Sequence, residues 1–303
     1  MAVTTKDNLA LLVLCSTPGY KGQNETVKPF TLAAYNKLER RLAAVGRTPA
    51  CFLTEKLDCL VEPLSLTPQE TTQIEALLLR AGELGRELER LAQQQIFIVG
   101  RSQDNYPSKL KDAMGQQAPV VFFYAGDLRL LEQETVAIIG SRTANAQEID
   151  YAAKHARISA QNGRTVVSGG AKGIDAVAKE SALRAGGAVV TYVADTMGNY
   201  VDKHREEILW GKMLVLSSFH PDATFRGYNA LERNRHIYAS SDYAVVVSAG
   251  DETGGSYKGA ATCLKQNLCP LYVKDDGQAP IGNQKLIALG GLPLNEAHER
   301  LGT

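Results

Sequence analysis

The spacing of apolar residues changes near residue 96 and divides the chain into two parts. In the first part, apolar residues recur every three or four positions, as they do on one face of an amphipathic helix. This spacing predicts helices over 9–14, 31–44 and 67–94, with connectors at 17–29 and 46–63. Thr67 and Glu70, on either side of Pro68, form a capping box that predicts the start of the third helix. We therefore expect residues 1–95 to form a small helical N-terminal domain.

After residue 96, short apolar runs alternate with helical patterns. The runs predict strands at 96–99, 120–124, 136–139, 165–167, 188–193, 213–216, 243–248 and 271–273. Helices are expected at 148–161, 174–185, 201–210, 231–239 and 256–266. This alternation predicts an α/β fold in which right-handed crossovers build a doubly wound, mainly parallel sheet over residues 96–303. Binding sites in such sheets lie beyond the carboxyl ends of the strands.

Composition narrows the function only slightly. The 303 residues include 33 basic and 33 acidic side chains, so a general polyanion-binding coat is not expected, although a local basic groove is compatible with this balance. No apolar run reaches the roughly 20 residues that cross a bilayer, and no signal peptide is visible, so we expect a cytoplasmic protein. The five cysteines form no CxxC pair and have no histidine at ligand spacing, which favours reduced thiols and no metal site.

Two glycine-containing turns give the strongest indication of a binding site. The first is Gly140-Ser141-Arg142, directly after an apolar run. The second contains Ser168, Gly169, Gly170, Lys172, Gly173 and Asp175. Small residues between a strand and a helix allow a phosphate to reach backbone N–H groups, where the helix dipole favours an anion. With Arg142 and Lys172 as a cationic wall, the turns predict one composite pocket for a nucleotide or a nucleic-acid backbone. Asp175 fits an orienting role and an ordinary helix start equally well.

Two further segments extend this prediction. Arg233, Asn234 and Arg235 offer guanidinium groups suited to phosphate, although a solvated helix face paired with Glu232 explains them equally well. Gly254, Gly255 and Ser256 form another glycine turn between a strand and a helix. The P-loop and GxGxxG patterns are absent, and no histidine or carboxylate pair stands at catalytic spacing. We therefore predict a binding protein without catalytic residues or a cofactor.

In their order along the chain, these segments resemble the DprA/Smf family of DNA-processing proteins. The resemblance rests on residues 104–110 and 118–127, on 136–142 ("VAIVGSR" in the family), on 168–175 ("SGLA.GID"), on Phe225 with 233–235 ("FP.RNRIIA") and on 242–249 with 253–256 ("VVVEA...SGS"). It implies an extended Rossmann-like domain over 96–303 that binds single-stranded DNA and assists recombination or the handling of incoming DNA. It also implies a homodimer and a RecA-type recombinase as a partner, as in natural transformation.

By the same resemblance, Arg142 and Lys172 would contact phosphates, with Arg233 and Arg235 along the same groove. The glycines of the second turn would shape that groove, and the binding would be sequence-independent and salt-sensitive. The sequence departs from the family where "AH" reads Ala178-Lys179 and where the segment around Tyr200 lacks a proline. Little sequence follows Gly291, so a C-terminal winged-helix-like domain is not expected. These departures indicate a divergent member.

A LOG-type nucleotide sensor or nucleosidase, in a mobile-element or defence setting, is the alternative. That type carries a PGGxGTxxE signature with a catalytic glutamate. Here the sequence Glu252-Thr253-Gly254-Gly255-Ser256 lacks the proline, and no glutamate follows it within the predicted helix. The helix offers Lys258 and Lys265 instead, which favours binding of DNA over hydrolysis of a nucleotide.

Overall fold

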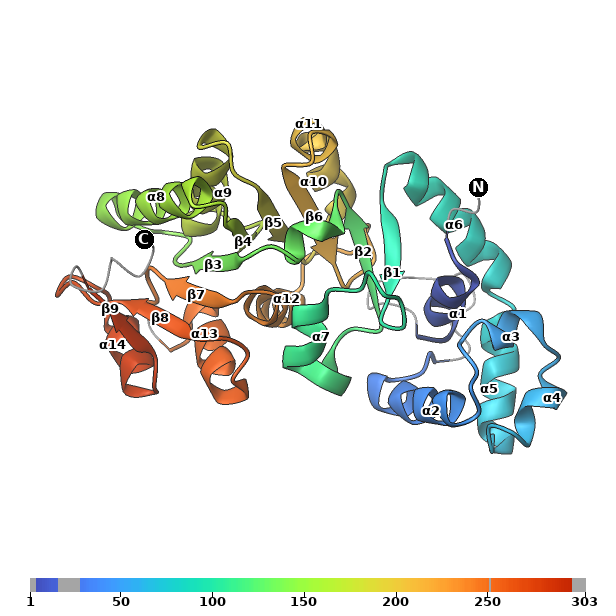
Figure 1. Cartoon of the computed structure of the whole chain (residues 1–303). Coiled ribbons are helices and arrows are strands. Elements are labelled where there is room, and N and C mark those ends of the chain that lie inside the picture. Colours follow the sequence, from blue (N-terminus) through green and yellow to red (C-terminus); the bar gives the residue numbers. More distant parts are fainter. Residues whose placement is uncertain (1–3, 16–27, 251, 296–303) are drawn as a thin grey trace.

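The computed structural model describes residues 4–15, 28–250 and 252–295, and its strands form one nine-stranded sheet (Figure 1). The strands are β1 (Phe97–Gly100), β2 (Val121–Ala125), β3 (Thr135–Ile139), β4 (Thr165–Gly169), β5 (Val189–Tyr192), β6 (Met213–Ser217), β7 (Tyr243–Val246), β8 (Leu271–Lys274) and β9 (Leu292–Leu294). Their order across the sheet is β1-β2-β6-β5-β4-β3-β7-β8-β9. Strand β2 is antiparallel to its neighbours β1 and β6, and the other neighbouring pairs among these strands are parallel, so the predicted mainly parallel α/β sheet is confirmed.

Helices cover both faces of this sheet. The helices that follow β1 are α7 (Ser108–Met114), α8 (Ala146–Gln161), α9 (Ile174–Arg184), α10 (Met197–Lys203), α11 (Arg205–Leu209), α12 (Gly227–Ala239), α13 (Gly255–Gln266) and α14 (Ile281–Ala288). Helices α8 to α11 lie on one face, and α7 with α12 to α14 lies on the other (Figure 1). Short 3-10 turns at Gly115–Gln117 and Leu128–Leu131 complete the connections.

Strand β3 shows why the sheet is sandwiched between two helical layers. All five of its residues are buried. Val136 and Ile138 pack with the alanines of α8 and α9, whereas Ala137 and Ile139 pack with the apolar residues of α12 and α13. Because successive side chains of a strand point to opposite faces, a strand that is apolar throughout needs cover on both sides.

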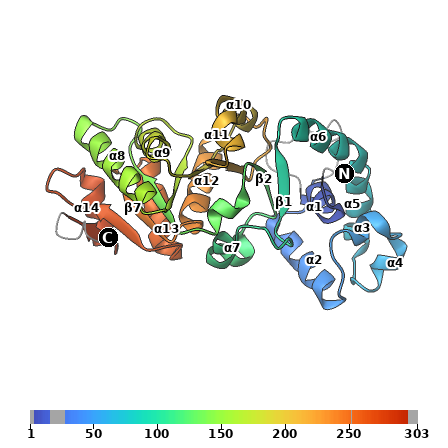
Figure 2. The ribbon, with the colours of Figure 1, turned by 45° about the horizontal axis from the view of Figure 1, so that its top comes forward.

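The N-terminal helices lie at the β1 end of the sheet (Figure 2). They are α1 (Lys6–Cys15), α2 (Leu32–Ala44), α3 (Cys51–Thr54), α4 (Asp58–Val61), α5 (Pro68–Leu78) and α6 (Ala81–Gln93). Asn8 of α1 accepts a hydrogen bond from the Gly100 N–H at 2.8 Å and donates to the Ile98 carbonyl at 3.1 Å. Helix α1 thereby satisfies backbone groups on the edge strand β1, which would otherwise be open to pairing with another chain. Most of the predicted connector at 17–29 lies outside the described residues.

The single helix predicted over 67–94 is wrong. The capping box of Thr67 and Glu70 is present, with Pro68 at the first helical position, but α5 ends at Leu78 and α6 begins at Ala81. Between them, Arg80 donates to the carbonyl oxygens of Leu12 and Val13 near the end of α1. Tertiary contact with another helix therefore interrupts a pattern that is continuous in the sequence.

Other boundaries also differ from the sequence prediction. The helix expected over 201–210 is divided into α10 and α11 at His204, whose side chain is buried. The connector expected at 46–63 contains the two short helices α3 and α4, while α7, α14 and β9 were not predicted. These elements are short and their apolar residues are few, so each depends on packing against neighbours more than on its own periodicity.

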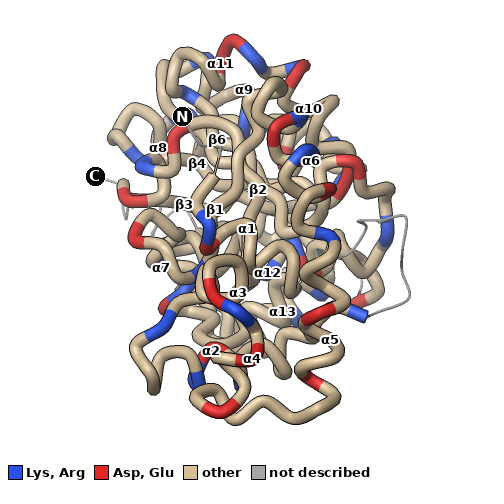
Figure 3. The backbone as a smooth tube through the Cα atoms, turned by 90° about the vertical axis from the view of Figure 1, so that its right-hand side faces the viewer, with Lys and Arg blue, Asp and Glu red and all other residues tan. Residues whose placement is uncertain are grey.

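Charge is distributed evenly at the end of the molecule seen in Figure 3, where Lys and Arg alternate with Asp and Glu along the backbone. This agrees with the formal net charge of zero. Among the helices that the structure describes, none combines the length and apolar character needed to cross a membrane.

Candidate nucleic-acid interface

A cavity of about 460 Å³ lies at the carboxyl edge of the sheet. Nine of the residues that the sequence singles out line it: Gly140, Ser141, Arg142, Asp175, Arg233, Asn234, Gly254, Gly255 and Ser256. They come from the turn after β3, from the beginnings of α9 and α13, and from the middle of α12. Strands β4 and β7 are the neighbours of β3, so parallel pairing places the segments that follow these strands at one edge.

Close backbone contact holds the first two turns together. Gly173 has a positive φ of 80°, and a Cβ at this position would overlap the carbonyl oxygen of Ser141. The same carbonyl oxygen accepts a hydrogen bond from the Ile174 N–H at 3.2 Å. Only a glycine accommodates both the φ value and the approach, so the turn at 168–175 is built to lie on the Gly140–Arg142 turn.

A buried ion pair forms the floor of the cavity. Arg233 is 6% exposed, and its Nη1 donates to the Tyr192 carbonyl oxygen at 3.2 Å and lies 3.9 Å from Asp175 Oδ2. A Cβ on Gly169 would overlap this guanidinium group, so the glycine is required for the arginine to fit. Burial raises the pKa of Asp175 to about 6, although the positive charge of Arg233 opposes this shift. The same burial lowers the pKa of Arg233.

The beginning of α13 faces the cavity. Gly254 is its N-cap residue and provides no side-chain cap for the first backbone N–H groups. Ser256 Oγ donates to the Gly140 carbonyl oxygen at 2.7 Å, and Asn234 Nδ2 donates to the Gly255 carbonyl oxygen at 3.3 Å, which fixes the helix start against β3 and α12. Uncapped N–H groups and the positive end of the helix dipole together suit an anion.

Cations outnumber carboxylates around this cavity. Arg142 and Lys258 are both exposed and line it, and neither has a carboxylate oxygen within 4 Å among the described residues. Asp175 is the one carboxylate among the lining residues that the structure describes, and Arg233 faces it. The local balance is therefore positive even though the whole chain is neutral.

Six predicted residues do not line the cavity. They are Ser168, Gly169, Gly170, Lys172, Gly173 and Arg235. Ser168 is buried and donates to the Ile138 carbonyl oxygen at 2.9 Å, while Lys172 is exposed. Arg235 is held by Glu232 at 2.8 Å and by Gln117 and Gln266, which matches the interpretation of an ion-paired helix face.

Among the lining residues that were absent from the predicted site, an aromatic residue and a lysine bear most on its chemistry. Phe225 is 58% exposed beside the cavity, and Lys258 lies in the first turn of α13. Phe225 is part of the segment that resembles "FP.RNRIIA", and Lys258 was noted only as an argument against hydrolysis. The aromatic residue at the start of this segment is the sequence signal that could have identified Phe225, because bases stack on aromatic rings.

A second cavity, of about 290 Å³, lies between α1, β2 and α12. Leu11, Phe219 and other apolar residues form most of its wall, and its described lining contains Glu232 but no lysine or arginine. This cavity therefore does not suit a polyanion.

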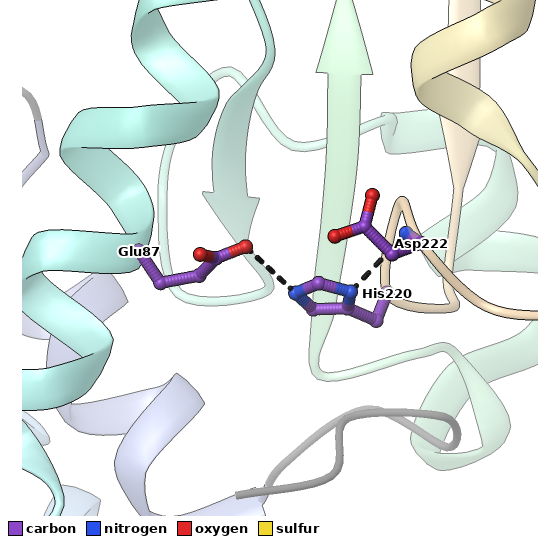
Figure 4. Close-up of side chains that lie close together, drawn as sticks. All are labelled: Glu87, His220 and Asp222. Atoms are coloured by element: carbon purple, nitrogen blue, oxygen red, sulfur yellow. Dashed lines mark hydrogen bonds and ion pairs between the residues drawn. The ribbon is translucent and has the colours of Figure 1, made fainter.

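Figure 4 shows a second cluster of ionisable side chains, Glu87, His220 and Asp222, whose ligand-type atoms lie within 4.8 Å of one another. His220 Nδ1 accepts the Asp222 backbone N–H at 3.2 Å, so the neutral ring carries its proton on Nε2, which lies 3.1 Å from Glu87 Oε1. Arg90 also binds Glu87 at 2.6 Å and Asp222 at 2.7 Å. The ring has no lone pair directed at a metal and a guanidinium already supplies the positive charge, so the cluster ties α6 to the β6–α12 loop.

Comparison with known proteins identifies the family. The model of the family described as DNA recombination-mediator protein A matches residues 97–301. The chain belongs to this family. DNA processing protein DprA of Streptococcus pneumoniae (strain ATCC BAA-255 / R6) is 32% identical over 156 residues, which are 50% of this chain and 54% of that protein. Protein Smf of Escherichia coli (strain K12) is 27% identical over 222 residues, which are 70% of this chain and 57% of that protein.

The chain spans little more than half the length of these two curated relatives. Among solved structures, DprA from Streptococcus pneumoniae has a TM-score of 0.70 at 20% identity, covering 96% of this chain and 95% of that one. This likeness shows the fold. DNA processing protein A from Helicobacter pylori, described for its single-stranded DNA binding mode, has a TM-score of 0.54 at 26% identity and covers 66% of this chain and 90% of that one. The resemblance to the DprA/Smf family is thus confirmed.

Proposed function

We propose that the protein binds single-stranded DNA in the cavity at the carboxyl edge of the sheet and acts in DNA processing. This proposal rests mainly on the excess of cations around the cavity. Arg142 and Lys258 lie at its rim, and neither has a carboxylate partner among the described residues. Membership of the DNA recombination-mediator family, and the relative described for its single-stranded DNA binding mode, support this proposal.

In this proposal each part of the cavity has a distinct task. Arg142 and Lys258 contact phosphate oxygens, and Lys172 adds positive charge to the adjacent turn. The uncapped start of α13 offers backbone N–H groups to a phosphate. Phe225, exposed beside these cations, provides a face on which a base stacks, an interaction that favours single strands over duplex DNA.

We further propose that this site binds without catalysing a reaction. Its described lining holds no histidine or cysteine, and its one carboxylate, Asp175, faces Arg233 and the backbone N–H groups of Gly140 and Gly169. This carboxylate is buried and its oxygens already face these groups, so we assign it the task of holding Arg233 in place. Because the glutamate of the LOG-type signature is also missing, DNA binding is favoured over nucleotide hydrolysis.

Two further properties follow from the family resemblance and remain proposals: self-association as a homodimer and contact with a RecA-type recombinase. A cytoplasmic location, which is expected from the sequence pattern, is a proposal as well. The division into a helical domain at 1–95 and a sheet domain at 96–303 is also a proposal. One continuous apolar cluster joins the N-terminal helices to the sheet, so the two parts are packed together.

The test is a fluorescence-anisotropy titration of a labelled oligothymidylate at several salt concentrations. Arg142→Ala should weaken binding about tenfold and lower the slope of log affinity against log salt by about one. Arg184→Ala is the matched control, because this arginine is exposed at the far end of α9 and pairs with Glu180. An equal loss of affinity in both variants, or a folded parent protein that does not bind the oligothymidylate, would contradict the proposal.

A further inference from the structure

A buried lysine lies one helical turn beyond Asp175 on α9. Lys179 is 8% exposed, and its Nζ lies 3.1 Å from Tyr200 Oη and 3.1 Å from His204 Nε2. Both partners come from the α10 segment, which lies beside α9 on the same face of the sheet (Figure 1). The proposed DNA-binding cavity does not include any of the three.

The part of the chain that the structure describes offers no counter-ion to the ammonium group of Lys179. Among the described residues, no carboxylate oxygen lies within 4 Å of its Nζ, although its side chain is almost wholly buried. A buried charge normally has a partner of opposite sign, because removing it from water is otherwise costly. An anion that binds nearby would supply the missing charge.

His204 does not remove the positive charge. Burial, and then the charge of Lys179, lower the pKa of His204, so the ring is neutral at pH 7. Its Nε2 therefore accepts a hydrogen from the ammonium, and its Nδ1 carries the remaining proton at 3.7 Å from Glu207 Oε1. Glu207 is in this way separated from Lys179 by the full width of the imidazole.

Tyr200 connects the lysine to the glycine turn. Its Oη accepts a hydrogen bond from Lys179, which leaves its own hydroxyl hydrogen available to another acceptor. Its ring lies against Gly170, where a Cβ would stand 3.2 Å from Tyr200 Cε2. Gly170 is exposed and Tyr200 is only half-buried. A phenol that faces an ammonium on one side and an exposed turn on the other is a strong hydrogen-bond donor for an anion.

Lys179 also stands where the sequence departs from the family pattern. It occupies the position of the histidine in "AH", whereas Tyr200 matches the tyrosine of the family's "GLDxxYP" segment, whose proline is missing here. The structure brings this lysine into direct contact with the tyrosine. The replacement of a histidine by a lysine places a more basic side chain behind the tyrosine.

We propose that Tyr200 and Lys179 form a second phosphate-binding site next to Gly170. When one phosphodiester group of a single-stranded DNA lies in the cavity, this second site binds another phosphodiester group further along the same DNA. This site rests on the proposed binding of single-stranded DNA. Tyr200 donates its hydroxyl to a phosphate oxygen, and Lys179 supplies the charge through the tyrosine. His204 orients the lysine.

The experiment compares Tyr200→Phe and Lys179→Met with the parent in anisotropy titrations of a long and a very short oligothymidylate. Both variants should weaken binding of the long oligonucleotide about tenfold, as expected for a lost hydrogen bond to a charged group. Binding of the short oligonucleotide, which fills only the cavity, should change by less than about twofold. The double variant should lose scarcely more than either single variant, because the two residues act as one unit.

Tyr243→Phe is the matched control, since this half-buried tyrosine begins β7 at the opposite edge of the sheet. Tyr200→Phe keeps the ring against Gly170 and retains the fold, so its result stands even if Lys179→Met unfolds. If the parent binds, Arg142→Ala loses binding and Tyr200→Phe does not, the proposed function holds and the second site is wrong. A parent that binds no oligonucleotide overturns both.

Discussion

Two groups of charged side chains behave differently in this protein, although both combine arginines with carboxylates. In the cluster of Glu87, Arg90, His220 and Asp222, every charge has a partner within the cluster. At the cavity, Arg142 and Lys258 have no carboxylate within 4 Å among the described residues. The first group ties two segments of the chain together, and the second leaves positive charge for a ligand. The local charge balance, more than the residue types, separates a structural role from a binding role.

We expect the largest difference between the cavity and the Glu87 cluster from one glycine substitution near each of them. Gly169→Ala places a methyl group where the Arg233 guanidinium lies, so we expect a loss of about 3 kcal/mol of stability and of nearly all DNA binding. Gly85→Ala in α6 meets no atom within 4 Å and should stabilise the protein by up to about 1 kcal/mol. Thermal unfolding and anisotropy titration measure both. Similar behaviour of the two variants would show that Gly169 is not constrained by Arg233.

Removing one arginine from each group should give opposite results. Arg90→Ala breaks contacts with Glu87 and Asp222, so we expect a loss of about 1 kcal/mol of stability with unchanged DNA binding. Arg142→Ala should leave stability within about 0.5 kcal/mol, because this exposed arginine has no carboxylate partner among the described residues, while DNA binding weakens. Denaturant unfolding of both variants tests the contrast, which fails if Arg142→Ala is the more destabilising change.

Acid should also change the stability of the folded protein in opposite directions through the two regions. The pKa of Asp175 is raised to about 6, so between pH 6 and 4 the folded state holds a proton that the unfolded state lacks, and this group adds stability as the pH falls. Burial lowers the pKa of His220, so below about pH 6.5 the unfolded state takes up the proton and stability falls. Each effect is at most about 1.4 kcal/mol per pH unit.

Asp175→Asn and His220→Gln make these contributions visible in unfolding experiments between pH 7 and 4. Relative to the parent, Asp175→Asn should lose stability more steeply as the pH falls. His220→Gln should lose it less steeply. Parallel curves for all three proteins would show that neither group titrates differently in the folded and unfolded states.

The smallest effect is expected at Arg235. Its guanidinium group is engaged by Glu232, Gln117 and Gln266, and the residue does not line the cavity. Arg235→Ala should therefore change DNA affinity by less than about twofold. Arg142→Ala removes the same positive charge but should weaken binding about tenfold. A tenfold loss in the same titration would mean that Arg235 leaves its partners to contact DNA.

Sequence reasoning found the parts of the candidate site that depend on local chain geometry. The turns at 140–142 and 168–175 combine strand ends with glycines, and parallel pairing of β3 with β4 places them side by side. It did not distinguish the residues that line the cavity from those that lie beneath or beside it. Ser168 is buried and bonds to the Ile138 carbonyl oxygen, and Arg235 bonds to Glu232. Phe225 was not selected, because the exposure of one aromatic side chain depends on how distant segments pack.

The sequence by itself determined the α/β class, the order of most strands and helices, and the positions of the glycine turns, because apolar periodicity and glycine content act over short distances along the chain. Only the tertiary structure decided that Arg80 interrupts a continuous helical pattern and that Arg233 lies buried against Gly169. It also decided that Lys179 lies beside Tyr200 without a counter-ion among the described residues. These features depend on contacts between residues far apart in sequence, where the partner of a charge is set by the fold and not by its neighbours in the chain.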